Sequence, residues 1–141
     1  MSNQFLTHPQ TGGICFGNVV EMKTRGAIIP AGEVRLISGK HVGPNRGWGA
    51  AHIWAEHALE MEERGFLTYE AVPAYVATIV RQGTPLFFDG GQMRQIRLMG
   101  VRATTGTAVL EFRDRREGPI WSVVTAFSGV RTHGTRVGTV R

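Results

Sequence analysis

The spacing of apolar residues changes near residue 84, and this change limits the folds open to the chain. Between Trp48 and Arg64 apolar residues recur every three or four positions, which predicts an amphipathic helix that ends before Gly65. Its predicted core-facing stripe is Ala51, Trp54, Ala55, Ala58 and Leu59.

A second helix is predicted up to Gln82, starting near Thr68 or Val72 and stopped by Gly83. Because Pro73 is tolerated only in a first turn, the regular helix should begin close to Val72. Its apolar stripe is Val72, Tyr75, Val76, Ile79 and Val80.

Beyond residue 84 the pattern is typical of strands separated by polar turns. We expect strands at 85–88, 94–102, 107–113 and 120–127, the last being the most hydrophobic and therefore central. In the third of these, alternation places Ala108, Leu110 and Phe112 on one face and Val109, Glu111 and Arg113 on the other.

These elements predict one α+β domain over residues 1–141, with N-terminal helices packed on a mostly antiparallel four- to five-stranded sheet. The glycine-rich residues 1–33 are expected to be irregular, with a short strand near 34–37 and a loop over 38–49. The composition of residues 128–141 is compatible with a flexible tail.

The charge of the chain favours a polyanionic partner. The formal net charge is +5, and Lys23 and Lys40 are its only lysines, so the positive charge is mostly arginine. Arginine suits bidentate contacts to phosphate, although a GC-rich genome would also enrich it. The sequence therefore predicts nucleic acid or another polyanion as the partner.

Several function classes are disfavoured. The single Cys15 excludes an internal disulfide and a thiolate zinc cluster. No stretch approaches the roughly 18 apolar residues of a membrane span, and no secretory signal is visible at the start. We therefore expect no membrane partner, and expect something outside these residues to deliver the chain if it leaves its cell.

His52 and His57 are the first candidate catalytic residues, because histidine exchanges protons near neutral pH. On an ideal helix they would lie about 140° apart, so they can cooperate only if His52 sits at the helix entrance. Glu56 follows His52 by one helical turn and is placed to orient it. The competing interpretation is that one histidine is an interior hydrogen-bonding group and the other is solvent-exposed.

Thr125 is the second candidate, in the segment from Trp121 to Phe127. Strict alternation places its hydroxyl on the same face as the apolar Trp121, Val123 and Phe127, where it needs a partner or can donate to a phosphate oxygen. The competing interpretation is that threonine is simply a favourable strand residue.

Four further residues are candidate RNA-binding groups. Lys40 and Arg46 flank the entrance to the histidine helix, Arg113 precedes the Thr125 strand, and Trp48 can stack on a base. If the strands pair in order, the three cations would converge on one cleft. No metal-binding pattern and no cofactor motif is present, so no cofactor is expected.

The helix carrying residues 49–57 (GAAHIWAEH), followed by strands ending in residues 121–127 (WSVVTAF), resembles the barnase/EndoU/colicin/RelE superfamily of small ribonucleases, in particular its polymorphic-toxin members. The resemblance covers residues 34–128 in element order and about a dozen positions in detail. It implies catalytic roles for His52, His57 and Thr125.

That resemblance implies a metal-independent endoribonuclease toxin, acting on RNA such as tRNA by attack of the ribose 2′-hydroxyl to leave a 2′,3′-cyclic phosphate. It further implies an effector domain delivered to the cytoplasm of a target cell and neutralised by an acidic immunity protein. The alternatives are a non-catalytic basic nucleic-acid-binding module and a toxin of another enzyme class, for which no nicotinamide-site signature is visible.

Overall fold

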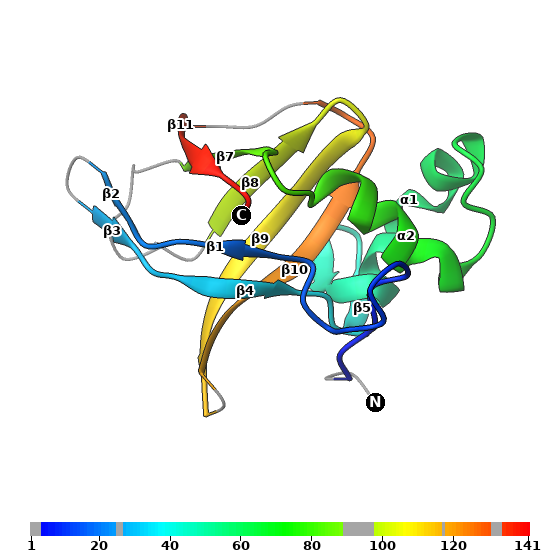
Figure 1. Ribbon diagram of the computed structural model, residues 1–141. Coiled ribbons are helices and arrows are strands. Elements are labelled where there is room, and N and C mark those ends of the chain that lie inside the picture. The colour runs from blue at the N-terminus through cyan, green and yellow to red at the C-terminus, as the bar shows by residue number, and fades with distance from the viewer. Residues whose placement is uncertain (1–3, 25–26, 89–97, 117, 131–133) are drawn as a thin grey trace.

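A seven-stranded mixed sheet forms the body of the protein in the computed structural model, which describes residues 4–24, 27–88, 98–116, 118–130 and 134–141 (Figure 1). Its strands, in spatial order, are β1 (Gly17–Val19), β4 (Gly32–Arg35), β10 (Gly118–Phe127), β9 (Gly106–Arg115), β8 (Leu98–Ala103), β7 (Pro85–Phe88) and β11 (Thr135–Thr139). β4 and β10 run parallel, and the other neighbours with a recorded register are antiparallel.

The sheet curls until its two edges are joined. Asn18 in the edge strand β1 and Arg141, just beyond the opposite edge strand β11, exchange two backbone hydrogen bonds of 2.8 Å each. Such closure satisfies backbone groups that an open edge would leave unpaired. It encloses a core in which the largest fully buried side chain is that of Trp121, whose indole Nε1 donates to the Pro30 carbonyl at 2.9 Å.

Two small hairpins accompany the sheet. β2 (Met22–Thr24) pairs with β3 (Ala27–Ile29), and β5 (Lys40–Gly43) pairs with β6 (Arg46–Trp48). The expectation of an irregular segment over residues 1–33 is therefore wrong, as is that of a loop over 38–49. Glycines in both segments suggested loops, but they serve the turns and close approaches of short strands.

Both helices lie beside one end of the sheet: α1 (Gly49–Glu63) and α2 (Val72–Ile79), with a short 3₁₀ turn η1 (Tyr69–Ala71) leading into α2 (Figure 1). The predicted start of the second helix near Val72 is confirmed, and its apolar stripe is fully buried. The helix ends three residues earlier than expected, because Val80 is already extended.

The predicted fold class is wrong. The helices follow six strands instead of preceding the sheet, and the sheet has seven strands, including one parallel pair, instead of four or five. The missed strands of this sheet are short and glycine-containing: β1 comes from the N-terminal segment and β11 from the tail, whereas β4 overlaps the short strand predicted near 34–37. Such strands carry too few alternating positions to give a clear pattern.

The predicted core stripe of α1 is also wrong. The helix buries Ala50, Ile53 and Met61, whereas Leu59 is 76% exposed. The buried face differs from the predicted stripe already in the first turns, before the break in helical geometry at His57 (φ −129°, ψ 20°). Three of the five predicted stripe residues are alanines, whose small side chains indicate the buried face only weakly.

Candidate functional site: a histidine pair between a hairpin and a helix

The entrance of α1 is fixed against the segment that follows β4. The backbone N–H groups of Ala50 and Ala51 donate to the carbonyls of Ile37 (2.9 Å) and Ser38 (2.8 Å), which satisfies groups that a helix start leaves unpaired. Gly49 has φ +77°, and a side chain there would collide with the Ile37 carbonyl. The first turn of α1 is therefore held next to the β5–β6 hairpin.

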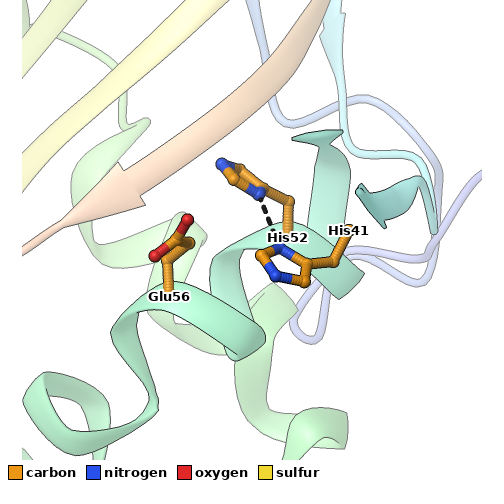
Figure 2. Close-up of side chains that lie close together, drawn as sticks. All are labelled: His41, His52 and Glu56. Carbon is orange, nitrogen blue, oxygen red and sulfur yellow. Dashed lines mark hydrogen bonds between the residues drawn. The ribbon is translucent and has the colours of Figure 1, made fainter. Parts of the chain in front are cut away.

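His52 and His41 meet at this junction (Figure 2). His52, in the first turns of α1, is 5% exposed, and its Nδ1 lies 3.2 Å from Nδ1 of the exposed His41 in β5. The two rings are nearly parallel, with centroids 5.4 Å apart and an interplanar angle of 21°. Two nitrogen lone pairs repel at this distance, so the contact requires a shared proton or another cation between them.

Glu56 completes the cluster from one helical turn beyond His52, as its spacing predicted. Ligand atoms of His41, His52 and Glu56 all lie within 4.8 Å of one another, and Figure 2 shows the three side chains drawn together from the helix and the hairpin. Glu56 Oε1 accepts a hydrogen bond from the backbone N–H of Asn45, in the turn between β5 and β6. The carboxylate thus ties the helix to the hairpin.

Burial favours the neutral form of His52. Burial lowers the pKa of His52 below its ordinary value, opposed by the Glu56 carboxylate and reinforced by the neighbouring His41 and His57. Burial is the largest of these effects because it penalises the charged imidazolium. A neutral imidazole keeps one lone pair that can accept a proton or bind a metal ion.

His57 lies at the helix break and belongs to a second group. Its Nδ1 is hydrogen-bonded to Glu60 Oε2, and its ring packs on Phe127 at a centroid distance of 5.8 Å. Glu60 Oε1 accepts from both the backbone N–H and the hydroxyl of Ser128, each at 2.7 Å. Burial raises the pKa of Glu60, but the hydrogen bonds from Ser128 and His57 outweigh it and lower the pKa overall.

The structure shows how His52 and His57 are placed relative to each other. His52 does sit at the helix entrance, beside the basic hairpin, and His57 projects from the break in the helix, close enough to influence the pKa of His52. The partner in direct contact with His52, however, is His41 and not His57.

Thr125 does not share a face with Trp121 and Val123, so that expectation is wrong. The register of β10 on β9 shifts between Val123 and Thr125, a β-bulge that turns the strand over. Thr125 is paired with Val109, away from the core-facing Ala126. Its hydroxyl oxygen is buried without a hydrogen-bond partner in the part of the chain that the structure describes.

The face that carries Thr125 holds both polar and apolar side chains of β9 and β10. Cross-strand partners share a face, so Ser122 lies there with Glu111, and alternation along β9 adds Arg113. The predicted alternation of β9 is confirmed: Ala108 and Leu110 are buried, and Arg113 pairs with Glu111 at 3.0 Å on the other side. The Nε of Arg113 is buried without a partner among the described residues.

The remaining predicted RNA-binding residues belong to the hairpin. Lys40 and Arg46 are exposed on β5 and β6, and Trp48 is half-buried at the end of β6. Among the described residues, no recorded contact joins Arg113 to these cations. Their convergence on one cleft remains a prediction.

His41 is the residue that sequence reasoning missed. It lay in a glycine-rich segment interpreted as a loop, eleven positions before His52, and no helical or motif spacing connects the two. Recognising the segment as a hairpin, from the alternation around the Pro44–Asn45 turn, would have placed it against the helix entrance.

Comparisons with protein-family models, curated proteins and solved structures found no match to this chain. Among the described residues, no helix is long and apolar enough to cross a membrane. The function must therefore be argued from the site itself.

Proposed function

We propose that the protein is a metal-independent endoribonuclease that cleaves RNA by attack of the ribose 2′-hydroxyl on the adjacent phosphorus. The proposal depends on one observation: Nδ1 of the buried His52 lies 3.2 Å from Nδ1 of the exposed His41, which belongs to the basic β5–β6 hairpin. Paired imidazoles can supply the base and the acid that this reaction needs.

The contact between the rings gives them complementary roles. When His52 donates its Nδ1 proton to Nδ1 of His41, His52 Nε2 keeps a lone pair and His41 Nε2 carries a proton. His52 Nε2 then takes the proton of the 2′-hydroxyl, O2′ bonds to phosphorus, and the bond from phosphorus to O5′ breaks. A proton from His41 Nε2 reaches O5′, while the Nδ1 proton shifts from His52 to His41.

The products of this step are a 2′,3′-cyclic phosphate and a 5′-hydroxyl, and no net proton is consumed. Each positioned proton transfer typically contributes about 10²–10⁴-fold to the rate. DNA lacks the attacking hydroxyl and should be spared. His57 is the rival acid, because Glu60 holds its Nδ1 and its other ring nitrogen remains to act.

Two features support transfer at a phosphate. The hairpin that carries His41 also carries the exposed Lys40 and Arg46, which suit phosphate contacts. The unpartnered hydroxyl of Thr125 and Nε of Arg113 lie on one face of the sheet, and such donors can stabilise the charge of a pentacoordinate phosphorus.

The resemblance to ribonuclease toxins also suggests a partner and a place of action for the proposed enzyme. A chain with a sequence pI near 10.3 would be bound fastest by an acidic inhibitor, so the proposal includes an acidic immunity protein and action in the cytoplasm of a target cell. Growth arrest on expression of the wild type, but not of His52→Ala, is the expected result.

The direct test is incubation of the purified chain with total RNA in EDTA, followed by analysis of the new ends. Cleavage should fall at least about 100-fold in His52→Ala and in His41→Ala. The His57→Ala variant identifies the general acid. If it loses as much cleavage activity as His41→Ala does, the general acid is His57 and not His41. Salt-sensitive RNA binding without cleavage would overturn the proposal in favour of a non-catalytic binding module.

A further inference from the structure

We propose that His41, His52 and Glu56 also form a binding site for a first-row transition-metal ion, with Zn²⁺ as the best-fitting ion, and that occupation of this site switches off the endoribonuclease. The metal site is argued from the distances between these three side chains. The inhibitory effect rests on the function proposed above.

The distance between the two histidine nitrogens fits a shared ion. Zinc binds imidazole nitrogen at about 2.0–2.1 Å in tetrahedral geometry, which places two such nitrogens about 3.3 Å apart. The Nδ1 atoms of His41 and His52 are 3.2 Å apart, so the distance between them fits one shared ion once the rings turn to direct their lone pairs at it. Two imidazoles and one carboxylate, with a fourth position left for water, form a ligand set that zinc commonly takes.

Glu56 supplies the third ligand with a small adjustment. The ligand atoms of the three residues lie within 4.8 Å of one another, and a rotation of the carboxylate shortens the remaining distance. Asn45 occupies Oε1 through its backbone N–H, and such a hydrogen bond orients a carboxylate whose other oxygen binds the ion.

A glycine lies directly beside the pair. A Cβ atom on Gly47 would sit 2.4 Å from the Lys40 carbonyl oxygen and 2.7 Å from Nδ1 of His52, so no side chain from this position covers the two rings. Gly47 also has φ +143°, a conformation that residues with side chains rarely adopt. Because His41 is exposed while His52 is buried, an ion can reach the buried ligand from the surface of the hairpin.

Metal binding and base catalysis exclude each other at His52. An imidazole that binds a metal through Nδ1 carries its proton on Nε2 and has no lone pair left for the 2′-hydroxyl proton. Zinc on the Nδ1 pair also occupies the position through which the two rings share a proton. Micromolar zinc should therefore inhibit cleavage, and a chelator should restore it.

The test measures binding first, without RNA. Tag-free protein is titrated with Zn²⁺ by calorimetry and with Co²⁺ by visible absorption, which reports imidazole ligation. One ion should bind per chain, and His41→Ala and Glu56→Gln should each raise the Kd at least about tenfold. His41 and Glu56 are not in the buried core, so these variants should keep the circular dichroism spectrum of the wild type.

The matched control is His8→Asn, because His8 is a histidine outside the cluster whose Nδ1 accepts backbone hydrogen bonds that asparagine can keep. Its metal affinity should equal that of the wild type. Wild-type affinity in His41→Ala, or binding lost equally in His8→Asn, would overturn the metal site.

Cleavage assays then separate this inference from the proposed function. Cleavage in EDTA that zinc suppresses in the wild type supports both proposals. Zinc binding with no cleavage under any condition, or cleavage that requires zinc, would overturn the proposed function and the inhibition while leaving the metal site intact.

Discussion

Replacing Thr125 with valine should stabilise the protein while impairing its activity. The hydroxyl oxygen of Thr125 is buried and has no hydrogen-bond partner among the described residues. Burying an unsatisfied hydroxyl costs about 1–3 kcal/mol, and valine fills nearly the same volume without a polar atom. We therefore expect Thr125→Val to raise the free energy of unfolding by about 1–2 kcal/mol.

A chain of 141 residues has an unfolding entropy of about 0.3 kcal/mol/K near its melting temperature. The expected stabilisation therefore raises Tm by about 3–7 °C, measurable by calorimetry or by circular dichroism. If the hydroxyl stabilises the transition state, RNA cleavage should fall by about 10–100-fold in the same variant.

A threonine in the neighbouring strand β9 offers a control whose replacement should lower the free energy of unfolding. Thr107 lies on the same face of the sheet, is 1% exposed, and donates its hydroxyl to the Gly129 carbonyl at 2.7 Å. Thr107→Val removes that bond and should lower the free energy of unfolding by about 1–2 kcal/mol. If Thr125→Val destabilises the protein as much as Thr107→Val does, the Thr125 hydroxyl cannot be an unsatisfied buried group.

Two further predictions concern the site. Gly47→Ala should reduce cleavage and zinc affinity together, because its Cβ would lie 2.7 Å from His52 Nδ1, and normal values of both would show that the hairpin simply moves aside. Glu60→Gln should flatten the acid limb of the stability–pH curve. Because folding lowers the pKa of Glu60, its carboxylate stabilises the folded protein at pH values above the pKa of the unfolded chain, about 4.3. This stabilisation is lost as the pH falls through the pKa that Glu60 has in the folded protein. Urea unfolding between pH 3 and 6 measures it, with the exposed Glu62→Gln as control, and equal slopes in both variants would contradict the role of Glu60.

The sequence predicted well wherever the local pattern alone determined structure. The buried stripe of α2 follows from helical spacing around a proline in the first turn, and the faces of β9 follow from simple alternation. The approach of Glu56 to His52 from one helical turn away also follows from spacing.

The errors arose where distant contacts or local irregularities decide. The bulge between Val123 and Thr125 reverses the face of every later residue in β10, and no residue type in that strand announces it. The buried face of α1 was predicted wrongly because alanines make up most of the predicted stripe and indicate the buried face only weakly. The parallel pairing of β4 with β10 joins segments more than 80 residues apart, so local pattern carries no information about it.

Only part of the candidate site could be predicted from the sequence, because one of its contacts joins residues of two separate elements. His52 and His57 are close in sequence and were easily compared, whereas the His41 contact depends on a hairpin closing over the helix entrance. The structure thus shifts the weight of the proposed mechanism from a pair within one helix to a pair across two elements.

The proposed mechanism is tested most directly by the chemistry of the RNA ends that the wild type, His41→Ala and His52→Ala produce in EDTA. We expect 2′,3′-cyclic phosphate ends from the wild type and at least about 100-fold less cleavage from either variant, each with an unchanged circular dichroism spectrum. Equal cleavage by the wild type and both variants, or RNA left intact by all three, would rule out the histidine-pair mechanism.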